Sequence, residues 1–197
     1  MSISNENDIT AYRQPEHEIN PQFLERWSPR SFTNEEIPED TLMSLIEAAR
    51  WAPSGSNNQP WRFIIARTPE QRAAFHTFIA PANVAWCEKA PVLLLLISNT
   101  ITPRGTLNPS HAFDAGTAWG YLALEANNQG LVTHAMGGFD PDKAREVLQI
   151  PADYALHAVI AIGHQGPKEA LTEQLQEREV PSGRRPVSEL IIQGKFE

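Results

Sequence analysis

The chain has 197 residues, of which 41% are hydrophobic and 20% are charged, proportions that are ordinary for a globular protein. Its 24 Asp and Glu residues outnumber 16 Lys and Arg residues, and the net charge of -8 argues against a broad nucleic-acid or anionic-membrane surface. A local basic cluster can still bind a small phosphate, and the single cysteine, Cys87, excludes a disulfide within one chain.

The N-terminal stretch, residues 1–19, is polar, lacks periodicity and has no apolar segment typical of a secretory signal. We expect it to form a flexible arm. The longest apolar run, residues 90–97, is far short of the roughly 20 residues that span a bilayer. We therefore expect a cytoplasmic protein with no membrane partner.

The first half of the chain predicts helices and strands in alternation. Leu42, Leu45 and Ala49 recur at helical spacing and form one apolar stripe. Pro, Gly, Ser and Asn crowd the segment that follows, which is typical of a loop. In chain order, we expect a short helix from Pro21 that ends before Pro29, a helix over 38–52, a loop over 53–60, a strand over 61–66 and a helix from Thr68 and Pro69 to about Phe78.

The second half continues the alternation. Residues 90–98 are apolar throughout, which predicts a strand buried on both faces. After it we expect a loop over 99–110, a helix over 111–129 closed by Gly130, a strand over 131–138, a helix from Asp140 and Pro141 to about Leu148 and a strand over 155–164. No linker divides the chain, so we predict a single domain over 20–197, of the α/β or α+β class, with a C-terminal extension from about residue 166.

Several common chemistries lack their sequence signals. The six histidines form no H-x-x-x-H or H-E-x-x-H spacing, so we predict no metal site, and His134, His157 and His164 are interpreted as packed or edge residues of strands. Cys87 adjoins Glu88, and an adjacent carboxylate disfavours a thiolate nucleophile. Neither the P-loop motif nor a G-x-G-x-x-G motif after a strand is present.

Three polar patches remain. In "RWSPRSF", residues 26–32, the side chains of Arg26, Ser28 and Arg30 alternate, so an extended backbone could aim all three at one phosphate. The loop "PSGSNNQPW" offers amide donors and acceptors that suit the edge of a planar ring. The adjacent glycines of "MGGFD" allow a ligand to approach the backbone closely. Taken singly, each patch is also compatible with a simple solvated or connecting turn.

Together and in this order, the patches resemble the nitroreductase family of flavoproteins, from Arg26 to about Ile192. "RWSPRSF" is similar to the family segment R-x-S-x-R-x-F, and "EAARWAPSGSNNQPWRFII" is similar to its helix, A-P-S-x-x-N-x-Q-P-W stretch and strand. "KAPVLLLL", "DAGTAWGYLALEANNQGLVTHAMGGFD" and "RRPVSELI" then follow in the expected sequence.

The resemblance implies an α+β, α/β-type sandwich with a central mixed sheet flanked by helices. It also implies a homodimer whose C-terminal tails extend onto the partner and whose interface binds FMN. The implied cofactor-binding residues are, for the phosphate and ribityl end, Arg26, Trp27 through its backbone, Ser28, Arg30 and Arg184, with Arg185 as the alternative; from the other subunit, Pro53, Ser54, Gly55, Asn57 and Gln59; and near the ring, Gly137 and Gly138.

The activity that the resemblance implies is ping-pong hydride transfer. NADH or NADPH would reduce FMN at N5, and a small acceptor such as a nitroaromatic or a quinone would then reoxidise it. The cofactor carries this chemistry, so no catalytic side chain is predicted. The Gly137 N–H is the candidate donor to N5, and residues 99–110 are the candidate wall of the acceptor site. A specialised dehydrogenase or dehalogenase of the same fold and a non-catalytic FMN-storage protein remain the alternatives.

Overall fold

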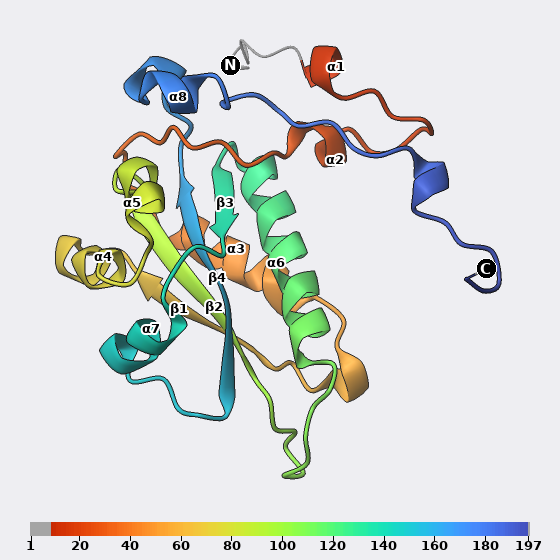
Figure 1. Ribbon diagram of the computed structural model, residues 1–197. Coiled ribbons are helices and arrows are strands. Elements are labelled where there is room, and N and C mark those ends of the chain that lie inside the picture. The colour runs from red at the N-terminus through yellow and green to blue at the C-terminus, as the bar shows by residue number, and fades with distance from the viewer. Residues whose placement is uncertain (1–8, 197) are drawn as a thin grey trace.

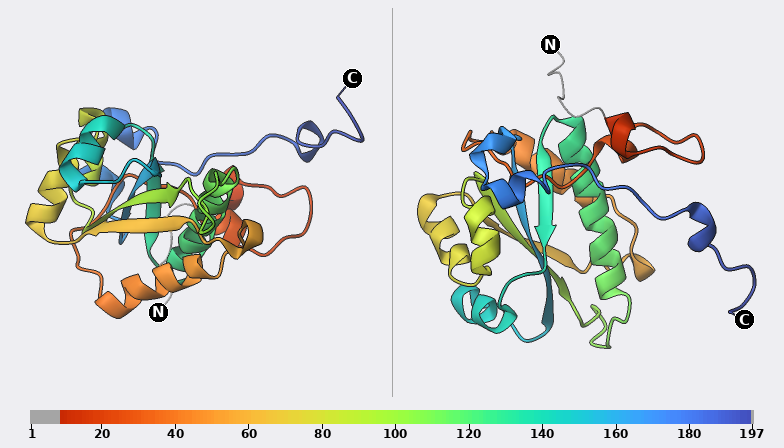
Figure 2. Two further views of the ribbon diagram at one scale, coloured as in Figure 1. Left: turned by 90° about the horizontal axis from the view of Figure 1, so that it is seen from below. Right: turned by 45° about the horizontal axis from the view of Figure 1, so that its top comes forward.

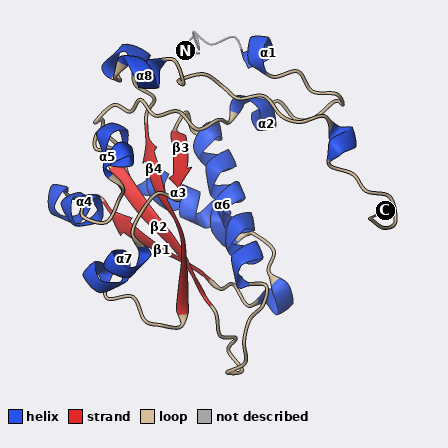
Figure 3. Cartoon of the chain, viewed as in Figure 1, coloured by secondary structure: helices blue, strands red, loops and turns tan. Residues whose placement is uncertain are grey.

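The structure is a computed structural model that describes residues 9–196. A four-stranded sheet lies at the centre, with helices on both of its faces (Figures 1 and 3). The strands are β1 (Trp61–Ala66), β2 (Val92–Asn99), β3 (Val132–Met136) and β4 (Tyr154–Gly163). The α-helices are α1 (Ile9–Tyr12), α2 (Gln22–Glu25), α3 (Glu39–Arg50), α4 (Pro69–His76), α5 (Pro81–Cys87), α6 (His111–Asn128), α7 (Pro141–Leu148) and α8 (Glu173–Gln176). Three 3-10 turns are η1 (Gly55–Asn57), η2 (Lys168–Ala170) and η3 (Val187–Glu189).

The sheet is antiparallel between every pair of described strands, in the order β1-β2-β4-β3. This corrects the expectation of a mixed sheet. The crossover through α6 returns the chain so that β3 runs in the same direction as β2. However, β3 lies two strand positions away, and β4 fills the gap with the opposite direction. Two strands of like direction therefore never become neighbours.

The β2 strand is the centre of the core, as its apolar sequence predicts. Leu93 and Leu95 pack into a cluster with residues of α4 and α5, whereas Leu94 and Leu96 pack on the opposite side with α3 and α6. Figure 2 shows the resulting layers, in which α3 and α6 cover one face and α4, α5 and α7 the other. A strand buried on both faces must be apolar at every position, which explains the absence of alternation.

The predicted helices over the middle of the chain are confirmed, with their ends set by local chemistry. Thr68 and Gln71 form a reciprocal capping box at the start of α4. The Asp140 carboxylate accepts the N–H groups of Asp142 and Lys143 at the start of α7. Gly130 follows α6 with a φ of 72°, the left-handed conformation that ends helices.

Two segments differ from the expectation. The sequence did not predict α5, because it is short and its Val, Trp and Cys residues are weak helix formers; it forms because it buries Trp86 and Cys87 against the sheet. Within the expected flexible arm, residues 9–12 form α1 and Arg13 is buried, while residues 1–8 lie outside the described part. Among the helices of the described part, none combines the length and the apolar character needed to cross a membrane.

Candidate functional site

A cavity of about 260 Å³ opens where the segment after α2 meets the start of the C-terminal tail. We call it the arginine cavity. Its lining consists of Arg13, Arg26, Trp27, Ser28, Arg30, His134, Arg178, Val180, Ser182 and Arg184. The structure thus brings together the five residues expected at a phosphate, although they come from two segments far apart in sequence. The hydrogen bond between Arg30 and Glu179, for example, joins residues 149 positions apart. Arg185 lines the neighbouring pocket instead.

The segment that carries Arg26, Ser28 and Arg30 is held by one buried carboxylate. Glu179 is 1% exposed, and its oxygens accept the N–H of Arg30 at 2.8 and 2.9 Å and the N–H of Ser31 at 2.8 Å. Charge-assisted hydrogen bonds to backbone N–H groups are among the stronger polar contacts in proteins. Glu179 therefore fixes the backbone of this segment against the tail.

A second tether comes from Arg13, which the sequence reasoning left within the arm. Its guanidinium donates to the carbonyls of Leu24 at 2.6 Å, Arg26 at 2.8 Å and Ser182 at 3.0 Å. One side chain thus connects the N-terminal segment, the segment after α2 and the tail. The polar sequence around Arg13 carries no signal for this role, because the three carbonyls come together only in the fold.

The cavity has an excess of positive charge. Burial lowers the pKa of Arg26, and the nearby Arg184 lowers it further. Burial also lowers the pKa of Arg30, followed by the effect of Arg178, while Glu179 acts in the opposite direction. Arginines nonetheless keep their charge at any ordinary pH. Five guanidinium groups line the cavity, so a dianion such as a phosphate monoester would relieve their mutual repulsion.

The loop over residues 53–60 has an unusual backbone. Ser56, Asn57 and Gln59 adopt φ values of 51°, 56° and 47°, in the left-handed region that residues other than glycine seldom occupy. Such conformations persist where the surroundings impose them, and they concentrate at ligand-binding sites. We call residues 53–59 the ring loop. It contains the five residues that the sequence assigned to the other subunit: Pro53, Ser54, Gly55, Asn57 and Gln59.

The ring loop is anchored at the N-terminal end of α6. The buried Asp114 carboxylate accepts the Gly55 N–H at 3.2 and 3.3 Å and the Ser110 hydroxyl at 3.0 Å. A Cβ at Gly55 would lie 2.7 Å from the Ser110 Oγ, so a larger residue would force the Ser110 hydroxyl to shift. The amide of Gln59 donates back to the Asn57 carbonyl at 3.1 Å, within the loop itself.

The glycine pair directly follows β3, the strand whose His134 lines the arginine cavity. His134 contacts the Pro29 carbonyl, and Gly137 follows three residues later, about 10 Å further along an extended backbone. Gly137 is exposed, with open space where a Cβ would be. Gly138 instead packs closely on Asn83, whose amide donates to its carbonyl at 3.1 Å.

The arginine cavity and the ring loop lie at opposite ends of α6 (Figure 1). The ring loop contacts the N-terminal end through Asp114, while α2 and the following segment lie near the end that leads into β3. A helix of 18 residues is about 27 Å long. The structure therefore places the two groups of predicted residues at different ends of this helix within one chain.

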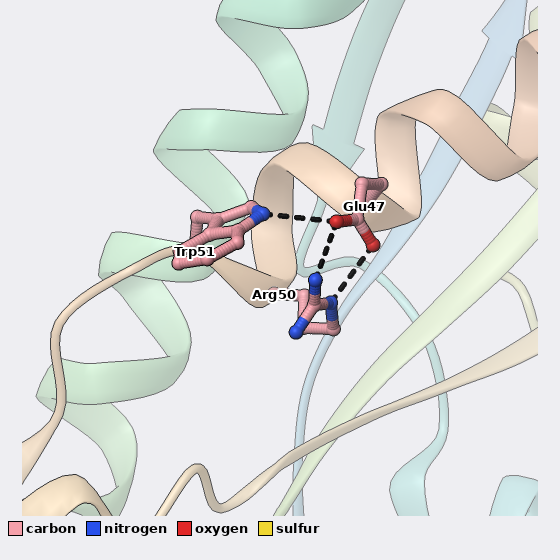
Figure 4. A network of polar contacts seen from close by, with 3 residues as sticks. All are labelled: Glu47, Arg50 and Trp51. Carbon is pink, nitrogen blue, oxygen red and sulfur yellow. Dashed lines mark hydrogen bonds and ion pairs between the residues drawn. The ribbon is translucent and has the colours of Figure 1, made fainter.

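An exposed tryptophan lies two residues before the ring loop begins. Trp51 is 69% exposed, and its indole N–H donates to Glu47 at 2.9 Å (Figure 4). Arg50 also donates to Glu47, and its guanidinium lies 4.8 Å from the centre of the Trp51 ring. The hydrogen bonds from Arg50 and then Trp51 lower the pKa of Glu47 to about 2. An exposed ion pair adds little stability, so its effect is to orient the indole.

The remaining reactive side chains do not form a second centre in the described chain. Burial raises the pKa of the Cys87 thiol to about 12, which agrees with its interpretation as an inert thiol. The Ser98 hydroxyl is hydrogen-bonded to His111 Nδ1 at 2.7 Å and to His157 Nε2 at 2.6 Å. Within residues 9–196, no group of three or more His, Cys, Asp or Glu residues is placed to hold a metal ion.

Comparisons with known proteins agree on one family. The family model described as "Nitroreductase family" matches residues 24–85 and 76–164. The chain is 29% identical over 201 residues to an NADH dehydrogenase of Thermus thermophilus, covering 86% of this chain and 92% of that protein. It is 25% identical over 182 residues to an FMN reductase [NAD(P)H] of Bacillus subtilis, covering 83% and 72%. A crystal structure described as an oxidoreductase containing FMN is 40% identical, covers 99% of both chains and superposes with a TM-score of 0.90.

The Glu179 tether leads to the first prediction. In Glu179→Gln, the amide NH2 group would face backbone donors, so at least one hydrogen bond of Arg30 or Ser31 is lost in a buried place. We expect the free energy of unfolding to fall by about 1–3 kcal/mol, measured by urea denaturation. The exposed neighbour substitution Glu177→Gln is the matched control and should leave it unchanged. Equal stability of the two variants would contradict the tether.

Proposed function

The chain belongs to the nitroreductase family, and on that premise we propose that it is an NAD(P)H-dependent FMN oxidoreductase that reduces small acceptors such as nitroaromatics and quinones. The observation that carries the proposal is the arginine cavity, where guanidinium groups from distant segments converge around a space with excess positive charge. The phosphate of FMN is a dianion that suits this space.

In this proposal, Arg26, Ser28, Arg30 and Arg184 hold the phosphate end of FMN, and the backbone of Trp27 lies beside it. The five arginines that line the cavity include Arg13, whose three carbonyl partners leave it as a fixed source of positive charge behind the site. Gly137 and Gly138 then approach the ring, since they follow His134 along the same strand. The ring loop of the same chain lies at the opposite end of α6 from the cavity, about the length of this 18-residue helix away.

We therefore propose that a second copy of the chain completes the site with its ring loop. Phe113 and Tyr121 on α6 are 80% and 42% exposed, so this helix presents apolar area that a homodimer would cover. The tail beyond Val187 extends away from the domain (Figure 2), and Leu190, Ile191 and Ile192 along it are exposed. Apolar side chains exposed on an extended segment are unfavourable in water, which supports the proposal that the tail packs on the partner.

When bound, FMN would supply the redox chemistry, taking a hydride from NADH or NADPH at N5 and passing it to the acceptor in a ping-pong cycle. The chain's own contribution is position and charge. The cavity arginines hold one end of the cofactor, and the Gly137 N–H offers a donor beside the other. The loop over 99–110, closed by the bridge between Ile101 and Leu107, forms one wall of the acceptor site.

The direct test is anaerobic mixing of the FMN-loaded protein with NADH and, separately, NADPH. We expect rapid bleaching of the flavin absorbance near 450 nm with at least one donor, followed by recovery when a quinone or a nitroaromatic is added. The cofactor's own spectrum provides the readout. A flavin that stays oxidised with both donors would favour a storage protein. Reduction without recovery by either acceptor would favour the specialised dehydrogenase or dehalogenase.

The phosphate assignment gives a prediction of its own. Arg26→Ala removes a charged hydrogen-bond donor from the cavity, and FMN affinity should fall by about 1.5–3 kcal/mol, which is roughly a factor of 10 to 150. The dissociation constant is measured by fluorescence titration of the apoprotein. Lys89→Ala, which removes an exposed cation outside the cavity, is the control. Unchanged affinity in Arg26→Ala would reject the assignment of Arg26 to the phosphate.

The proposed partner contact is tested separately by removing residues 186–197, which leaves Arg184 in place. We expect a weaker dimer by sedimentation analysis, because the apolar stretch around Ile191 is lost. A variant with Leu190, Ile191 and Ile192 changed to Ser keeps the chain length and should show the same weakening. A dimer of unchanged stability in both variants would show that the tail does not hold the partner.

A further inference from the structure

His134 lines the arginine cavity, although its sequence context suggested a packed strand residue. We propose that its Nε2 atom accepts a hydrogen bond from a hydroxyl group on the ribityl chain of FMN, and so helps the protein to select a hydroxylated flavin. The proposal rests on the proposed function and adds to it a residue that reads the middle of the cofactor, between the phosphate and the ring.

The position of the proton on His134 is set by its other nitrogen. Nδ1 lies 2.9 Å from the Pro29 carbonyl oxygen. A carbonyl oxygen accepts but never donates a hydrogen bond, so Nδ1 must carry the hydrogen. In the neutral ring, Nε2 is then left with a lone pair. The Ser28 carbonyl also acts on the ring, but within residues 9–196 the hydrogen bond of His134 that meets ordinary distance and angle limits is the one from Nδ1 to Pro29.

The ring is also fixed in orientation. Its centre lies 4.5 Å from the centre of the buried Trp86 ring, at an interplanar angle of 41°. Trp86 in turn stacks with Phe32, at 6.2 Å and 18°. Packed between this aromatic wall and the Pro29 carbonyl, the imidazole has little freedom to turn, so Nε2 is a preorganised acceptor at the cavity.

The surroundings favour the neutral ring. Burial lowers the pKa of His134, the carbonyls of Pro29 and Ser28 act in the opposite direction, and the charges of Arg30 and Arg26 lower it further. A depressed pKa favours the uncharged imidazole. Its Nε2 therefore remains an acceptor beside guanidinium groups, which offer donors alone.

A lone pair on Nε2 suits the ribityl chain of FMN better than its phosphate. A lone pair facing a phosphate dianion would be repelled, and the guanidinium groups of Arg26 and Arg30 already suit the phosphate. A hydroxyl group donates a hydrogen bond, and it needs an acceptor when it leaves water. The ribityl chain carries hydroxyl groups next to the phosphate, and His134 lies between the phosphate segment and Gly137 on β3.

The experiment compares two ligands across two proteins. The ligands are FMN and a flavin whose ring nitrogen carries a five-carbon chain with the terminal phosphate but no hydroxyl groups. The proteins are the native full chain and His134→Asn, in which the shorter amide can still donate to the Pro29 carbonyl but has no group at the position of Nε2. Dissociation constants from fluorescence titration give the preference of each protein for FMN over the analogue.

We expect the native preference for FMN to fall by about threefold to tenfold in His134→Asn, the effect of one neutral hydrogen bond. His134→Gln, whose amide oxygen reaches the position of Nε2, should keep part of the preference. An equal preference in the native chain and His134→Asn would overturn the proposal, because His134 would then act on both ligands alike.

A measurement on the native chain avoids any loss of folding in the variants. The Nε2 nitrogen resonance of His134 should shift when FMN is added and remain unshifted with the analogue that lacks hydroxyls. The same shift with both ligands would overturn the role of His134. Failure of both ligands to bind the native chain would instead overturn the assignment of FMN itself, so the two failures are distinguishable.

Discussion

Five guanidinium groups gathered around one cavity repel one another, and the polar contacts that overcome this repulsion are the constraint on which the site depends. The buried Glu179 carboxylate binds the N–H groups of Arg30 and Ser31, and Arg13 binds three carbonyls from two distant segments. These contacts fix the backbone, and Glu179 offsets only part of the repulsion, at Arg30. The cavity therefore keeps its positive charge, which a bound anion would balance.

The same segments determine how the rest of the molecule is used. The cavity lies near the end of α6 that leads into β3, and the strained ring loop lies at its beginning, where Asp114 holds Gly55. A rigid helix keeps these two groups apart. Under the proposed function, a cofactor that uses both would take them from two copies of the chain, and the exposed apolar side chains of α6 and the tail support that proposal.

Local patterns predicted most of the secondary structure because each is decided by neighbours in sequence. The stripe of α3, the cap of α7 and the apolar run of β2 all correspond to elements of the structure. The failures have a different origin. Helix α5 depends on burying Trp86 and Cys87, and the antiparallel order of the sheet depends on β4 entering between β2 and β3. Contacts between distant segments decide both features, so no short window contains them.

The sequence by itself determined the segments of the site and the family to which they point, because those motifs are contiguous: "RWSPRSF", the ring loop and the glycine pair. Only the tertiary structure decided which side chains share a cavity. It added Arg13, Arg178 and His134 to the arginines already suspected, and it placed Arg184 rather than Arg185 at the cavity. The physical reason is that convergence of charge, burial of a carboxylate and the tautomer of an imidazole are set by partners far away along the chain.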